Sequence, residues 1–243
     1  MFTVLQKEIS AFFSTLTGYV VIVVFLVTNS LFMWVFKGDL NVLDRGYASL
    51  DTLFTMAPWV FLFLVPALTM RVFAEEKKSG TLELLLTQPI SEMRIVLGKY
   101  LAVLVLILFS LLPTLVFVFS LSRLGSPPGN LDTGGIAGSY IGLFFLAAAY
   151  ASVGIFASSL TDNQIVSFVL AVLVSFLLFT GFDLITEADL PGNMDLILVR
   201  LGISEHYRSI SRGVVDTRDL IYFLSVIGIF LLGTKTVLQS RKW

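Results

Sequence analysis

Residue types that could do acid–base, nucleophilic or metal chemistry are scarce in this sequence. The 243 residues contain one histidine, His206, and no cysteine. Thiolate catalysis, disulfides and cysteine-bound Fe–S clusters are therefore excluded, and no cluster of carboxylates or methionines offers a metal-ligand set. His206 lies among charged residues of a polar segment, so we expect a solvated surface histidine. No catalytic, cofactor-binding or metal-binding residue is predicted.

A phosphate-binding loop is also missing from the sequence. A P-loop needs the spacing G-x-x-x-x-G-K-[ST], in which backbone amides and the lysine hold the phosphates. The nearest segment, residues 233–236, lacks the upstream glycine and ends an apolar run. If the protein moves something, the energy comes from elsewhere.

The densest charged stretch with a defined spacing is residues 71–99, RVFAEEKKSGTLELLLTQPISEMRIVLGK. We name these residues the coupling segment. Gly80 interrupts the charges, and a helix can begin at Thr81 with Glu83 in its first turn, where an acid favours the helix dipole. Pro89 ends this helix after about two turns, because the residue before a proline disfavours the α conformation.

The short helix also has an apolar side, which is formed by Leu82, Leu85 and Leu86. We interpret it as a docking knob for a soluble partner, with the leucines inserted in a groove. Glu75 and Glu76 would then set the register as charges at the rim. An ordinary re-entry loop is the alternative interpretation.

Six long uncharged runs are expected to form the membrane-spanning helices that position this segment. Hydrophobic residues make up 56% of the chain and charged residues 14%, against about 25% in soluble domains. The expected spans are about residues 16–36, 53–70, 100–122, 136–160, 165–182 and 220–238. A span needs about 20 apolar residues. We predict an all-α integral membrane protein with six transmembrane helices. With 16 basic and 17 acidic residues, no nucleic-acid partner is expected.

Two flanking segments are expected at the membrane surfaces. Residues 1–14 have one apolar face and predict an interfacial helix that bends into the first span at residues 17–19, the alternative being the first turn of that span. Residues 183–219 would lie outside. Their apolar residues predict two short amphipathic helices resting on the outer surface: Met194, Leu198 and Leu201 in the first, and Tyr207, Ile210 and Val214 in the second.

The six uncharged runs have no ionisable residue, and Lys235 lies only where the sixth span extends beyond its run. This argues against an ion-coupled transporter and an intramembrane protease. Pro58 and Pro66 in the second span and Pro113 in the third each leave a backbone carbonyl that a neighbour must satisfy. Gly138 and Gly142 form a GxxxG pattern that fits either a subunit interface or tight packing within one chain. An even number of spans places both termini on one side. The count of basic residues only weakly favours the cytoplasm for that side.

The coupling segment resembles the hallmark of type-2 ABC transporter permeases, E-x-x-x-G-T-x-E-x-L followed by a proline. In that family it follows the second of six spans and forms a coupling helix that contacts the ATPase subunit. The resemblance extends along residues 1–243, as one permease domain of the ABC type-2 exporter fold. It implies an ATPase-coupling role for Glu75, Glu76, Gly80, Thr81, Leu82, Glu83, Leu84, Leu85 and Pro89. It carries over no substrate-contact residue.

Two further stretches resemble the gliding-motility-associated permeases, the GldF group: FFSTLTGYVVIVVFLVTNSLFMWVF and SEHYRSISRGVVDTRDLIYFLS. This resemblance implies a GldA-like ATPase and a second membrane subunit, either another copy or a GldG-like protein. It also implies a multi-pass protein in the lipid bilayer of the cell inner (plasma) membrane, with both termini cytoplasmic. The expected function is export or mechanical work at that membrane. The alternatives are a NosY-like or other ABC exporter permease and a non-transporting scaffold driven by an ATPase.

Overall fold

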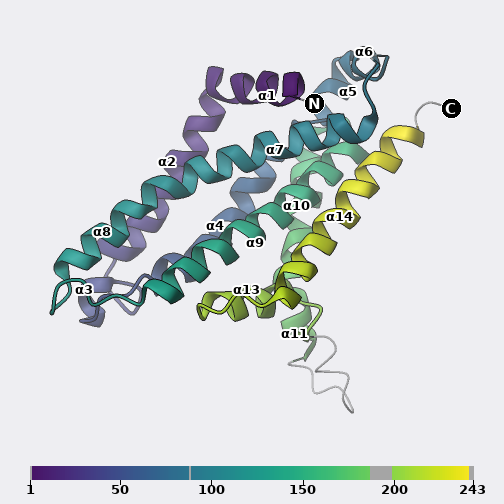
Figure 1. Ribbon diagram of the computed structural model, residues 1–243. Coiled ribbons are helices and arrows are strands. Elements are labelled where there is room, and N and C mark those ends of the chain that lie inside the picture. The colour runs from purple at the N-terminus through teal and green to yellow at the C-terminus, as the bar shows by residue number, and fades with distance from the viewer. Residues whose placement is uncertain (1, 88, 187–198, 241–243) are drawn as a thin grey trace.

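The computed structural model describes residues 2–87, 89–186 and 199–240, and every regular element in these ranges is helical (Figure 1). The elements in chain order are α1 (Phe2–Ser14), α2 (Leu16–Ser30) continued by η1 (Leu31–Val35), α3 (Val42–Arg45), α4 (Asp51–Thr69), α5 (Ala74–Lys78), α6 (Thr81–Leu86), α7 (Glu92–Leu111) continued by η2 (Leu112–Thr114) and α8 (Leu115–Leu124), α9 (Thr133–Leu160), α10 (Gln164–Phe176) continued by η3 (Leu177–Gly181) and α11 (Phe182–Thr186), α13 (Ile203–Ser211) and α14 (Thr217–Gln239).

Six of the described helices are long and apolar enough to cross a membrane, the number that the sequence predicts. They are Leu16–Val35, Asp51–Lys78, Glu92–Leu124, Thr133–Leu160, Gln164–Thr186 and Thr217–Gln239. Most of them extend beyond the uncharged runs. The third begins at Glu92, so the last turns of the coupling segment belong to a membrane-spanning helix.

α1 is a separate helix that lies across the end of α2 (Figure 1). The chain bends at Thr15, whose backbone is extended with φ −108° and ψ 153°. The expected bend at residues 17–19 is therefore wrong by two residues. Gly18 lies inside α2, where a Cβ atom would come within 2.9 Å of the carbonyl oxygen of Phe12. The glycine lets α2 start directly against the end of α1.

α9 is the most buried of the spanning helices and packs against α4, α10, α13 and α14. Small residues allow these close approaches. A Cβ atom on Gly138 would lie 2.5 Å from the carbonyl oxygen of Ile210 in α13, and one on Gly142 would lie 3.3 Å from the ring of Tyr207. Gly138 and Gly142 therefore serve tight packing within one chain, which favours that interpretation over a subunit interface.

α13 is a fixed part of the bundle and does not merely rest on its surface. Its residues Ile203, Tyr207 and Ile210 are buried, whereas Val214 lies beyond the helix and is exposed. The Tyr207 hydroxyl donates a hydrogen bond of 2.7 Å to the carbonyl oxygen of Phe54 in α4, the carbonyl that Pro58 leaves without an N–H partner. The first helix expected between residues 183 and 219 falls largely on residues 187–198, outside the described residues.

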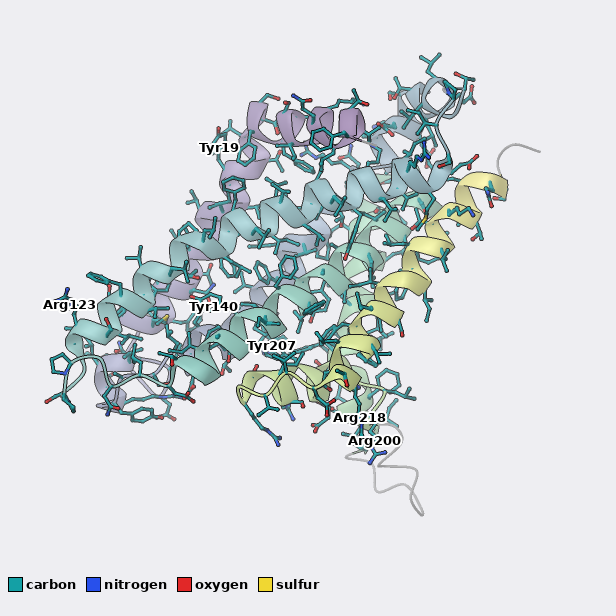
Figure 2. The ribbon with its side chains drawn as sticks, viewed as in Figure 1. Tyr19, Arg123, Tyr140, Arg200, Tyr207 and Arg218 are labelled. Carbon is teal, nitrogen blue, oxygen red and sulfur yellow. The ribbon has the colours of Figure 1, made fainter. Side chains whose placement is uncertain are left out.

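The molecule has two opposite ends. α1, α5 and α6 lie at one end together with the last turn of α14, and α3 and α13 lie at the other (Figure 1). Tyr19 and Arg123, near the two ends of the bundle, show this separation in Figure 2. We name the end with α6 the coupling end and the other the distal end.

Candidate functional site

The coupling segment folds into two short helices joined by a tight turn. α5 ends at Lys78, and Gly80 adopts the left-handed conformation with φ +72°. This conformation favours glycine, because a Cβ atom would be strained there. The Ser79 hydroxyl bonds the carbonyl oxygen of Glu75 at 2.9 Å and lies 2.9 Å from the hydroxyl of Thr81. α6 begins at Thr81 with Glu83 in its first turn, as the sequence predicts.

The leucines of α6 do not share one exposed face. Leu82 is 3% exposed and packs into the chain's own core, and Leu85 is partly buried against that core. Leu84 is 68% exposed and points away from it. In this conformation Leu82 is therefore not available to a partner's groove, contrary to the expectation, whereas the docking role of Leu85 stays a prediction. The other exposed residues include Thr81, Glu83 and Pro89. Leu84 is therefore an exposed leucine on a surface that also carries polar side chains.

The base of the coupling segment is fixed to the end of α9. The Ser158 hydroxyl accepts hydrogen bonds of 3.0 Å from the backbone N–H groups of Phe73 and Ala74. It also donates one of 2.9 Å to the carbonyl oxygen of Met70. Lys77 donates to the carbonyl oxygen of Ser159. These bonds satisfy backbone groups at the junction of α4 and α5, so this junction is held rigidly on α9.

Lys99 of α7 connects three further parts of this end. Its side chain is 1% exposed, and its ammonium donates to Glu8 Oε1 of α1 at 2.8 Å and to Glu76 Oε1 of α5 at 2.9 Å. The third bond, of 3.0 Å, goes to the carbonyl oxygen of Val72. All three donors of the ammonium are used. The nitrogen also lies 5.2 Å from the centre of the Phe73 ring, within the range of a cation–π interaction.

The charges of this cluster balance. Lys7 reaches the same Glu76 oxygen at 3.4 Å, so two lysines face two glutamates. A buried charge is tolerated only when it is paired and hydrogen-bonded. Glu76 is therefore an internal ion-pair partner, and the expectation that it serves as a rim charge is wrong. Glu75, its neighbour, is exposed and free to meet a partner.

Sequence reasoning missed Lys99, Glu8 and Ser158 as parts of this site. One signal was present for Lys99. It lies four residues after Ile95 and four before Val103, two positions that are fully buried, so helical periodicity places it on the inward face of α7. A lysine on such a face needs an acidic partner, but nothing local identifies Glu8, 91 residues away, as that partner.

A cavity of about 370 Å³ lies beside the cluster, between α1 and the coupling segment. Its lining includes Arg71, Glu75 and Ser79 on one side and Phe12 and Thr15 on the other. The cavity separates α1 from the turn at Gly80, so the ion cluster is the main polar connection between these two parts.

The distal end has a second ionic cluster, around the histidine. His206 Nδ1 lies 2.7 Å from Asp219 Oδ1 of α14, and Nε2 lies 2.9 Å from the carbonyl oxygen of Arg200. The ring stacks on Tyr222 at a centroid distance of 3.8 Å. The expectation of a solvated surface histidine is wrong. Nearby, burial raises the pKa of the Tyr207 phenol, which keeps it protonated as the donor to Phe54.

A family model described as "ABC-2 family transporter protein" matches residues 39–198, which are 160 of the 243 residues. The matched stretch contains the whole coupling segment and four of the six spanning helices. None of the curated proteins matches the chain.

Proposed function

This chain belongs to the ABC-2 family of transporter proteins, and we propose that it is a permease subunit driven by a separate ATPase that docks on the coupling segment. The single observation that carries the docking site is the exposed ridge of α6. Glu83 and Leu84 are exposed there, on a short helix whose base is anchored to the bundle. A rigid projection of this kind can transmit a movement of the bound ATPase to the spanning helices, whereas a flexible loop would only change its own conformation.

The contacts that anchor α5 and α6 would transmit this movement to the rest of the bundle. A displacement of α5 and α6 is passed to α9 through Ser158 and to α7 and α1 through Lys99. Breaking a buried ion pair costs roughly 3–5 kcal/mol. Such a connection is stiff enough for these elements to move together. We therefore extend the proposed coupling residues Glu75, Glu76, Gly80, Thr81, Leu82, Glu83, Leu84, Leu85 and Pro89 to include Lys99 and Glu8. In this extended set, Leu82 and Glu76 act inside the chain, and Leu84 and Glu83 act at the partner.

Within the family, the proposed subtype is the gliding-motility-associated group. Its support is the similarity of the first span and of the segment around α13 to that group. The partners would then be a GldA-like ATPase and a second membrane subunit, either another copy of this chain or a GldG-like protein. The coupling end and both termini would face the cytoplasm, and the distal end would lie outside the inner membrane.

A charge reversal tests the docking site. Glu83→Lys changes an exposed residue, so the variant should fold normally. We expect it to retain less ATPase during purification than the unchanged protein does, and the loss should depend on salt, because exposed ion pairs are screened. The matched control is Glu205→Gln, on α13 at the distal end. Equal retention by the unchanged protein and both variants would contradict the docking site.

A further inference from the structure

We infer that His206 and Asp219 form a site that holds one proton, and that this proton fastens helix α13 to the start of α14. The inference concerns the distal end alone and goes beyond the proposed function. It starts from the atoms around the imidazole. Both ring nitrogens lie within hydrogen-bond distance of an oxygen that has no proton of its own at neutral pH: Asp219 Oδ1 at 2.7 Å and the carbonyl oxygen of Arg200 at 2.9 Å.

Hydrogen-bond counting fixes the number of protons. A backbone carbonyl can only accept, so Nε2 must carry a hydrogen. If the ring were neutral in that tautomer, the lone pair of Nδ1 would face the lone pairs of an ionised carboxylate at 2.7 Å. A second proton between Nδ1 and Oδ1 removes this repulsion. Because a carboxylic acid is ordinarily the stronger acid, that proton resides on Nδ1 and the pair is imidazolium–carboxylate.

Burial makes the proton necessary. The side chain of Asp219 is 7% exposed and that of His206 is 16% exposed. Asp219 Oδ2 has no hydrogen-bond partner, and among the described residues His206 is the only ionic partner of this carboxylate. Without the proton, a buried carboxylate would be left uncompensated, which is costly. Tyr222, stacked on the imidazole, adds a cation–π contribution when the ring is charged.

Other charged groups of the surrounding elements do not replace it. Asp183 of α11 is engaged by the Ser204 hydroxyl at 2.8 Å and by Arg208 at 3.6 Å. The remaining charged residues of α13, of the segment before it and of the start of α14 are Arg200, Glu205, Arg212, Asp216 and Arg218. None of these forms an ion pair with His206 or Asp219 in the part of the chain that the structure describes. Arg200 and Arg218 lie at the same end of the molecule (Figure 2).

The proton would act at one side of α13. Three other sides of this helix are held without a proton: Tyr207 bonds α4, Ser204 bonds Asp183, and the carbonyl oxygen of Ser211 accepts from Ser139 of α9 at 3.3 Å. The contact with α14 has one hydrogen bond that does not need this proton, from the Tyr222 hydroxyl to the carbonyl oxygen of Leu201 at 2.6 Å, and one that does, between His206 and Asp219. Loss of the proton should therefore weaken the contact between α13 and α14.

The protonation state can be observed directly, because His206 is the only histidine in the chain. Purified full-length protein labelled with 15N in histidine rings gives one side-chain signal by NMR. We expect both ring nitrogens to be protonated in the unchanged protein. In Asp219→Asn the amide can donate to Nδ1, so the same ring should become neutral. A neutral ring in the unchanged protein would overturn the inference.

Hydrogen exchange of the backbone amides tests the fastening itself. Asp219→Asn removes the negative charge that pairs with the imidazolium, so we expect the amides of α13 to exchange several-fold faster than in the unchanged protein. Glu205→Gln, on the same helix and outside the pair, is the control and should leave the exchange unchanged. Equal exchange in Asp219→Asn and in the unchanged protein would overturn the proposed fastening.

Discussion

At the scale of single residues, Lys99 should have the largest effect. Lys99→Met removes the cation that pairs with Glu8 and Glu76, which leaves the largely buried Glu8 unpaired and Glu76 with the exposed Lys7 at 3.4 Å. We expect the free energy of unfolding to fall by roughly 3–5 kcal/mol. Lys7→Met is the matched control, because Lys7 is largely exposed and its pair at 3.4 Å contributes roughly 0–1 kcal/mol. Thermal unfolding in detergent measures both, and equal effects would contradict the cluster.

Two leucines of the same short helix should behave differently. Leu82→Ser removes a core side chain and buries a hydroxyl, so we expect a loss of stability of roughly 2–5 kcal/mol. Leu84→Ser should leave stability unchanged and instead reduce retention of the ATPase, because Leu84 is exposed. Leu43→Ser, at an exposed leucine of α3 at the distal end, is the control. If Leu84→Ser unfolds the protein while Leu82→Ser only affects binding, the assignment of the two faces is reversed.

At the scale of elements, the crossing of α4 and α9 depends on one glycine. A Cβ atom on Gly154 would lie 1.9 Å from Thr69 Oγ1 and 2.9 Å from Thr69 Cβ. Thr69 is fully buried and cannot move aside. We expect Gly154→Ala to destabilise the protein by about 1–3 kcal/mol through overpacking. Gly228→Ala in α14, where nothing lies within 4 Å, should be neutral or stabilising. A neutral Gly154→Ala variant would show that the two helices are not this close.

The elements were more predictable from the sequence than their contacts. The spans follow from uncharged runs, and the start of α6 follows from Gly80, because both signals are local. The orientation of α6 could not be predicted, since Leu82 and Leu84 lie on opposite sides of a helix with leucines all around. The partners of Lys99 and His206 could not be predicted either. Their acids lie 91 and 13 residues away, and only the packed bundle brings them together.

At the scale of the whole molecule, the two ends should lie on opposite sides of the membrane. Single cysteines at Ser79, at the coupling end, and at Val214, at the distal end, test this in a chain with no cysteine of its own. Both positions are exposed. On intact spheroplasts, an impermeant thiol reagent should label Val214→Cys and spare Ser79→Cys. Labelling of Ser79→Cys alone would place the coupling end outside, where no ATPase could reach it.

The central claim is that this chain does no ATP chemistry itself and works through a partner at the coupling end. The most direct measurement is ATP hydrolysis by the tagged full-length protein, purified from its native membranes before and after stripping of bound subunits. We predict hydrolysis by the intact complex, none by the stripped chain, and a reduced rate in complexes that carry Glu83→Lys. Hydrolysis that persists in the stripped chain would contradict this account.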